Sequence, residues 1–143
     1  MAIVIDDHLL LDVLAGTESR ELGDALDAGA VFTTGCWYYR LSRAVRTGSG
    51  TGSLSGRLSV LEPSQRDRAL AGLQDLPSTI GLIGSRTLIP PMTALRVRRP
   101  LNMLNADALA VALVVDGGIR VKTRSELLGG GARDLGVDYR VFS

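Results

Sequence analysis

Short β-branched segments alternate with helical segments along much of this chain, and this alternation limits the folds open to it. Residues 2–5, Ala-Ile-Val-Ile, are apolar at every position, as in a strand buried on both faces of a parallel sheet. Successive parallel strands need long crossover connections, which helices usually provide. The sequence therefore predicts an α/β fold, a three-layer α/β/α sandwich with a largely parallel sheet.

Glycines, prolines and capping residues set the expected boundaries of these elements. Strands are expected over residues 2–5, 30–34, 119–123 and 139–142. Helices are expected over residues 8–15, 36–46, 64–76 and 106–116, after Thr17 as an N-cap, and after Ser125, with Asn105 capping the helix over 106–116. The segment 80–91 combines strand-like residues with glycines and two prolines, so its structure stays open.

The length and composition favour one soluble domain with an aliphatic core. A chain of 143 residues can bury such a core, and a formal charge of +1 gives no global reason to bind nucleic acid. The Gly/Ser-rich segment 48–56 is expected to be a flexible loop within the domain. No stretch reaches the ~18 uncharged apolar residues of a membrane span, and a single cysteine suits a reducing compartment. We therefore expect a cytoplasmic protein.

Two acids fall where an α/β sheet usually forms its site. Asp6 directly follows the first expected strand, and Asp107 begins a helix that leads into another strand. Sites in parallel sheets form at the carboxyl ends of strands, so these carboxylates could meet and hold Mg²⁺ or Mn²⁺. The alternative is purely structural, because aspartate is favoured in the first turn of a helix and in turns generally.

Other polar and aromatic residues have simpler explanations. Ser125 is a good N-cap for the helix that follows it. His8 is expected to be packed or solvated, and Cys36 to be a small core residue. The aromatic residues 37–39 could stack bases but fit core packing better, and the basic run 96–99 could contact phosphates or simply be a solvated face.

Three blocks of the sequence match a known pattern in order and spacing. They are "IVIDDHLLLDVLAG", "LNADALAVALVVDGGIRVKTRSELL" and "ARDLGVDYRVF", with a weaker match in "AVFTTGCWYYRLSRAV". Together they resemble the PIN-domain family, and within it the small VapC-type toxin ribonucleases of toxin–antitoxin pairs. The resemblance covers roughly half of the chain, and residues 46–99 lie outside it.

The resemblance implies an active site that cuts RNA, in which about four acids surround one or two divalent ions. Asp6 occupies the first acid position and Asp107 the third. Arg40 falls at the second, and Ser125 at the fourth, where the family has the aspartate of Thr-x-Asp. Glu126 is next to Ser125, but in a helix a neighbouring side chain points about 100° away.

A depleted acid set changes the function that the resemblance implies. The main expectation is a PIN-like protein with impaired metal-dependent nuclease activity that binds RNA or a protein partner such as an antitoxin. A homodimer is compatible with this expectation. The alternative is an active Mg²⁺- or Mn²⁺-dependent endoribonuclease that uses Asp6, Asp107 and a nonstandard third acid. A shared fold with an unrelated role is a third hypothesis, because fold does not fix function.

Overall fold

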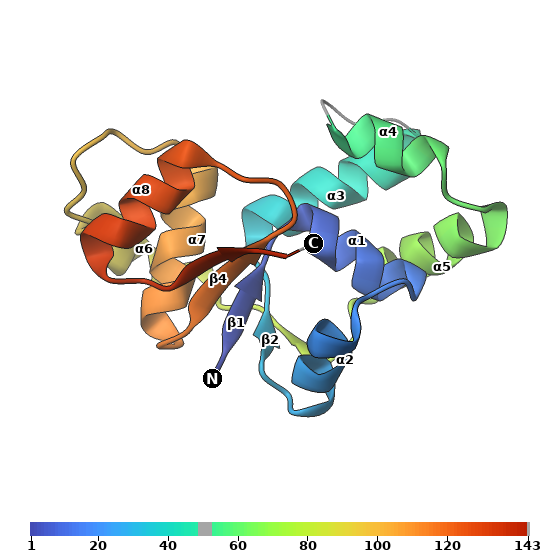
Figure 1. Cartoon of the computed structure of the whole chain (residues 1–143), viewed down its shortest axis with the longest axis horizontal. Coiled ribbons are helices and arrows are strands. Elements are labelled where there is room, and N and C mark those ends of the chain that lie inside the picture. Colours follow the sequence, from blue (N-terminus) through green and yellow to red (C-terminus); the bar gives the residue numbers. More distant parts are fainter. Residues whose placement is uncertain (49–52, 143) are drawn as a thin grey trace.

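The computed structural model describes residues 1–48 and 53–142, and these form alternating strands and helices (Figure 1). The elements follow in the order β1 (Ile3–Ile5), α1 (Asp7–Ala15), α2 (Arg20–Asp27), β2 (Val31–Phe32), α3 (Gly35–Thr47), α4 (Ser53–Ser59), α5 (Pro63–Gln74), β3 (Ile80–Gly81), α6 (Ser85–Thr93), α7 (Met103–Val114), β4 (Gly118–Val121), α8 (Glu126–Leu135) and β5 (Tyr139–Val141).

The sheet is parallel throughout, with the strand order β3-β2-β1-β4-β5. The chain builds outward from β1 to β2 and β3, then returns to the other side of β1 for β4 and β5. The strand order therefore reverses between β1 and β4. Ligand sites of open α/β sheets form at such a point, beyond the carboxyl ends of the strands. The expected α/β fold with a parallel sheet is confirmed.

Two apolar clusters flank the sheet and give the molecule its layers. Ile3 and Ile5 of β1 pack with apolar residues of α1, α3, α4 and α5, whereas Val4 packs in a second cluster with residues of α6, α7 and α8. Successive strand residues point to opposite faces, so an all-apolar strand can support both clusters. Figure 1 shows α7 and α8 on one side of the sheet and α1, α3 and α5 on the other.

Most expected elements are present, but two helix caps were assigned wrongly. Ser19, not Thr17, accepts the capping hydrogen bond of α2, and the Thr17 hydroxyl donates to Asp12 instead. Asn102, not Asn105, caps α7, whose first residue is Met103. Both errors involve capping residues a few positions apart, which the preference for polar caps alone cannot rank.

The two segments without a clear sequence signal contain helices. Strand β3 takes only the first two residues of the 80–91 segment, and α6 takes its end, with two prolines inside the helix. The last four residues of the expected loop 48–56 belong to the helix α4, so that part of the prediction is wrong. Leu54 of this helix is buried. Residues 49–52 of the expected loop lie outside the described residues.

None of the helices in the described ranges combines the length and apolarity that crossing a bilayer requires.

Candidate functional site

A pocket of about 310 Å³ opens where the strand order reverses. We call it the acid pocket, after the two adjacent acids at the end of β1 that line it. Its walls come from α1, α3, α7 and the β4–α8 connection. The lining residues are Asp6, Asp7, His8, Trp37, Arg40, Asn102, Leu104, Asn105, Val121, Thr123, Arg124, Ser125, Leu127 and Leu128. Asp6, Arg40 and Ser125 therefore meet in one pocket, although they are far apart in sequence.

Asp6 is a buried acid of the pocket that two backbone hydrogen bonds hold in place. It is the N-cap of α1, and one carboxylate oxygen accepts the backbone N–H of Leu9 at 2.9 Å. The other oxygen accepts the backbone N–H of Lys122 at 3.0 Å, so Asp6 joins the ends of β1 and β4. Burial raises the pKa of Asp6 to about 7, although the two hydrogen bonds favour the charged form. Both oxygens are thus already engaged by the backbone.

Arg40 pairs with Asp7, which was not among the predicted site residues. The Arg40 Nε lies 3.2 Å from Asp7 Oδ2, and the Asp7 side chain is 4% exposed against 44% for Arg40. The contact is an ion pair without a well-aligned hydrogen bond, because Asp7 Oδ2 has no hydrogen-bond partner among the described residues. Among the described residues, Arg40 forms no ion pair with Asp6 or with Asp107.

Asp107 has a structural contact that the sequence did not indicate. It is the fifth residue of α7, so it is not in the first turn, where the helix dipole would favour it. Its Oδ2 accepts the backbone N–H of Cys36 at 3.2 Å, near the beginning of α3. Asp107 is buried, but it is not among the described residues that line the acid pocket. It therefore serves the N-terminus of a neighbouring helix.

Ser125 acts as the helix cap that its sequence context indicates. Its Oγ accepts the backbone N–H of Leu128 at 3.3 Å, and its own backbone N–H donates to the Tyr139 hydroxyl at 2.8 Å. Glu126 lines a second, neighbouring hollow and is not a described lining residue of the acid pocket. Glu126 therefore does not bring an acid to the position in the acid pocket where Ser125 lies.

Asp12 is a buried acid that sequence reasoning missed. Its carboxylate pairs with Arg57 of α4 and, at 2.8 Å, with the Lys122 ammonium beyond β4. The Arg57 guanidinium also donates to the His8 carbonyl oxygen at 2.7 Å. An acid inside the apolar run Leu-Leu-Leu-Asp-Val-Leu was the available signal, because a carboxylate is rarely buried without cations. Lys122 links this cluster to Asp6, which its backbone binds.

The remaining sequence candidates divide between packing and the pocket. Burial lowers the pKa of His8, which is packed and lines the acid pocket. Burial, with a hydrogen bond to Asp107, raises the pKa of the Cys36 thiol to about 11. Trp37 is buried, whereas Tyr39 is exposed and the Tyr38 hydroxyl donates to the Leu73 carbonyl oxygen. The prediction of core packing thus holds for Trp37 and not for Tyr39.

The side chains present fit a tightly held Mg²⁺ or Mn²⁺ poorly. Both oxygens of Asp6 accept backbone hydrogen bonds, and a guanidinium lies against Asp7. In the described part of the chain, no three His, Cys, Asp or Glu side chains are grouped so that they could hold a metal ion. Hard divalent ions need several free oxygen ligands, and a nearby cation opposes them.

No protein-family model matches this chain, and the curated proteins contain no match to it.

Proposed function

We propose that this chain is a PIN-like protein, related to toxin–antitoxin ribonucleases, in which metal-dependent nuclease activity is impaired and binding is the main role. The observation that carries the proposal is the ion pair between Arg40 and Asp7 inside the pocket lined by Asp6 and Ser125. In the resemblance, Arg40 and Ser125 stand where two acids belong. A cation thus occupies the part of the pocket where the family concentrates negative charge.

Charge arithmetic supports a weakened metal site. Replacing two acids removes two negative charges, and a guanidinium about 4 Å from a divalent ion adds roughly 1–4 kcal/mol of repulsion per unit charge, depending on the effective dielectric. Asp6 and Asp7 remain, but each already has a partner. We place the protein in the cytoplasm, with RNA or a protein such as an antitoxin as its partner.

One observation favours the alternative of an active Mg²⁺- or Mn²⁺-dependent endoribonuclease. Asp7 lines the same pocket as Asp6, so it could serve as the nonstandard third acid beside Asp6 and Asp107. A metal ion would then have to displace the Arg40 guanidinium, which is 44% exposed and has room to move into solvent.

Restoring the missing acids provides the decisive experiment. The Arg40→Glu/Ser125→Asp variant should bind Mn²⁺ more tightly in calorimetry than the wild type, and should cut single-stranded RNA faster. Adding Asp6→Asn to this variant should abolish the gain. An Arg43→Glu/Ser64→Asp variant introduces the same charges on exposed or unrelated parts of the chain and is the matched control. Strong manganese-dependent cleavage by the wild type, abolished by Asp107→Asn, would favour the alternative.

A further inference from the structure

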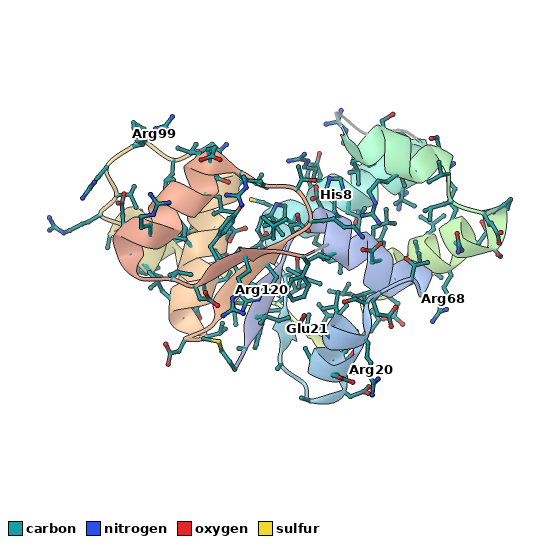
Figure 2. The ribbon with its side chains drawn as sticks, in the orientation of Figure 1. His8, Arg20, Glu21, Arg68, Arg99 and Arg120 are labelled. Atoms are coloured by element: carbon teal, nitrogen blue, oxygen red, sulfur yellow. The ribbon has the colours of Figure 1, made fainter. Side chains whose placement is uncertain are left out.

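A second, larger hollow adjoins the acid pocket. It has a volume of about 560 Å³ and lies between residues 97–99, the β4–α8 connection and the exposed side of α8. Arg124, Ser125 and Leu127 line both hollows, so the two are neighbours. We call the second hollow the arginine groove, after Arg98, Arg99, Arg124 and Arg133 on its walls. Figure 2 shows Arg99 on the loop beside α8, at the far end of the molecule from Arg20 and Arg68.

Ion pairs within the protein neutralise most of the groove's acids but few of its cations. Asp134 accepts the backbone N–H of Arg98 at 2.9 Å and pairs with its guanidinium at 3.6 Å, which fixes this loop against α8. Asp138 pairs with Arg120 and Arg140, which are not described lining residues of the groove.

Three arginines of the groove are not neutralised by an acid among the described residues. Arg99, Arg124 and Arg133 have no ion pair with any residue in the described ranges, and Glu126 is the one lining acid there without an ion pair. All three arginines are exposed at the groove. The groove therefore presents an excess of positive charge to a ligand in solvent.

The floor of the groove leaves room for a ligand to approach the α8 backbone. Gly130 lies in the middle of α8, and a Cβ at this position would meet nothing within 4 Å. Its neighbours differ, because a Cβ at Gly129 would approach the Tyr139 ring at 3.2 Å and one at Gly131 would approach Leu109 at 2.8 Å. Packing thus explains the two flanking glycines, while Gly130 keeps the groove open.

We infer that the arginine groove binds the phosphodiester backbone of single-stranded RNA without any metal ion. This inference rests on the proposed function, since it specifies where and how the binding role is carried out. Guanidinium groups match phosphate geometry through paired hydrogen bonds, and phosphate contacts of this kind supply sequence-independent affinity. Arg124 lines both hollows, so a strand bound in the groove lies next to the acid pocket at that residue.

Apolar surface in the groove favours RNA over an acidic peptide. Tyr139 and Val97 line the groove together with the arginines, and Tyr139 is only half-buried. Bases can stack on an aromatic face while their phosphates meet the arginines, whereas aspartate and glutamate side chains have no flat apolar face to offer.

Binding of a labelled oligouridylate in EDTA tests the inference with two kinds of variant. Arg99→Ala/Arg133→Ala should weaken binding about tenfold. In a plot of the logarithm of the association constant against the logarithm of the salt concentration, the slope should become shallower by about 1.4, the value for two lost phosphate contacts on a single strand. Arg20→Ala/Arg68→Ala removes the same charge elsewhere and should leave affinity and salt dependence near wild type. Gly130→Leu should block the groove while keeping or raising the melting temperature, because leucine favours helix over glycine. Gly23→Leu, in α2, is its control, since a Cβ there meets only one atom at 4.0 Å.

The inference is overturned if either groove variant, folded by circular dichroism, binds the oligonucleotide as the wild type does. It is also overturned if polyglutamate competes as well as RNA, which would make the groove a site for acidic peptides. Because all measurements are made in EDTA, failure here is distinct from failure of the proposed function, which the manganese-dependent cleavage assay decides.

Discussion

Removing the Arg40 side chain tests whether the acid pocket depends on a cation. Arg40→Ala leaves the Asp7 carboxylate in place, 4% exposed, with Oδ1 still accepting the backbone N–H of His8 at 3.0 Å. Its Oδ2 then loses the positive partner that lies 3.2 Å away, and it has no hydrogen bond from the described residues to compensate. We expect the variant to be less stable than the wild type.

The size of the effect follows from the unequal burial of the two partners. Removing one partner of a fully buried pair costs about 3–5 kcal/mol, whereas an exposed pair contributes about 0.2–1 kcal/mol. The Arg40 side chain is 44% exposed, so water can partly replace it and the cost should fall between these limits. We expect about 2 kcal/mol, which for a domain of this size corresponds to a fall of about 4–8 °C in melting temperature.

The assay is urea unfolding and thermal denaturation at neutral pH, arranged as a double-mutant cycle of Arg40→Ala and Asp7→Asn. The cycle isolates the pair, because the loss of the first-turn acid of α1 appears in both arms and cancels. Arg43→Ala removes an exposed arginine from the same helix and should change the free energy of unfolding by less than about 0.5 kcal/mol. If Mg²⁺ can take the place of the guanidinium, adding it should reduce the difference in melting temperature between Arg40→Ala and the wild type.

A coupling energy below about 0.3 kcal/mol would refute this reasoning, since values of that size fall within the usual additivity error. The same conclusion would follow if Arg40→Ala and Arg43→Ala had equal melting temperatures. Arg40 would then be an ordinary surface residue, and the pocket would be open to a metal ion.

Three further predictions concern the rest of the fold. Asp12→Asn should lower the free energy of unfolding in urea by about 3 kcal/mol, because it leaves two partly buried cations without their carboxylate; a loss below about 1 kcal/mol would contradict this. Burial raises the pKa of Asp6 to about 7 from 3.8, so its contribution to stability is complete below pH 3.8 and is lost as the pH rises toward 7, by up to about 4 kcal/mol. The free energy of unfolding should therefore change less with pH in Asp6→Asn than in the wild type. If it changes equally in both proteins, the raised pKa of Asp6 is contradicted. Gly117→Ala should cost about 1–3 kcal/mol, since its Cβ would lie 2.4 Å from the Ala2 carbonyl oxygen, whereas Gly35→Ala meets nothing within 4 Å and should be nearly neutral in the same unfolding assay.

The fold was largely predictable because its signals are local. The all-apolar β1 indicates a strand buried on both faces, and the sheet does use its two faces for two core clusters. The alternation of strands and helices indicates a parallel sheet with helical crossovers, as observed. Where local signals compete, the prediction failed: two asparagines three residues apart, Asn102 and Asn105, are equally good caps, and the helix begins after the first.

The candidate site was predictable only in part, because Asp107 was expected beside Asp6 and is not among the described residues that line the pocket. Asp6 at a strand end, Arg40 on a helix and Ser125 at a cap do line one pocket, because parallel strands end at one edge and the strand order reverses there.

The sequence by itself determined most of the strands and helices, though not α4 or α6, and the edge of the sheet that gathers polar groups. Only the tertiary structure decided that Arg40 meets Asp7, that Asp12 lies between two cations and that Asp107 serves the beginning of α3. The physical reason is the range of each effect. Backbone preference and hydrophobic period act between neighbouring residues, whereas an ion pair depends on side chains from distant segments reaching within a few ångströms after the layers have packed.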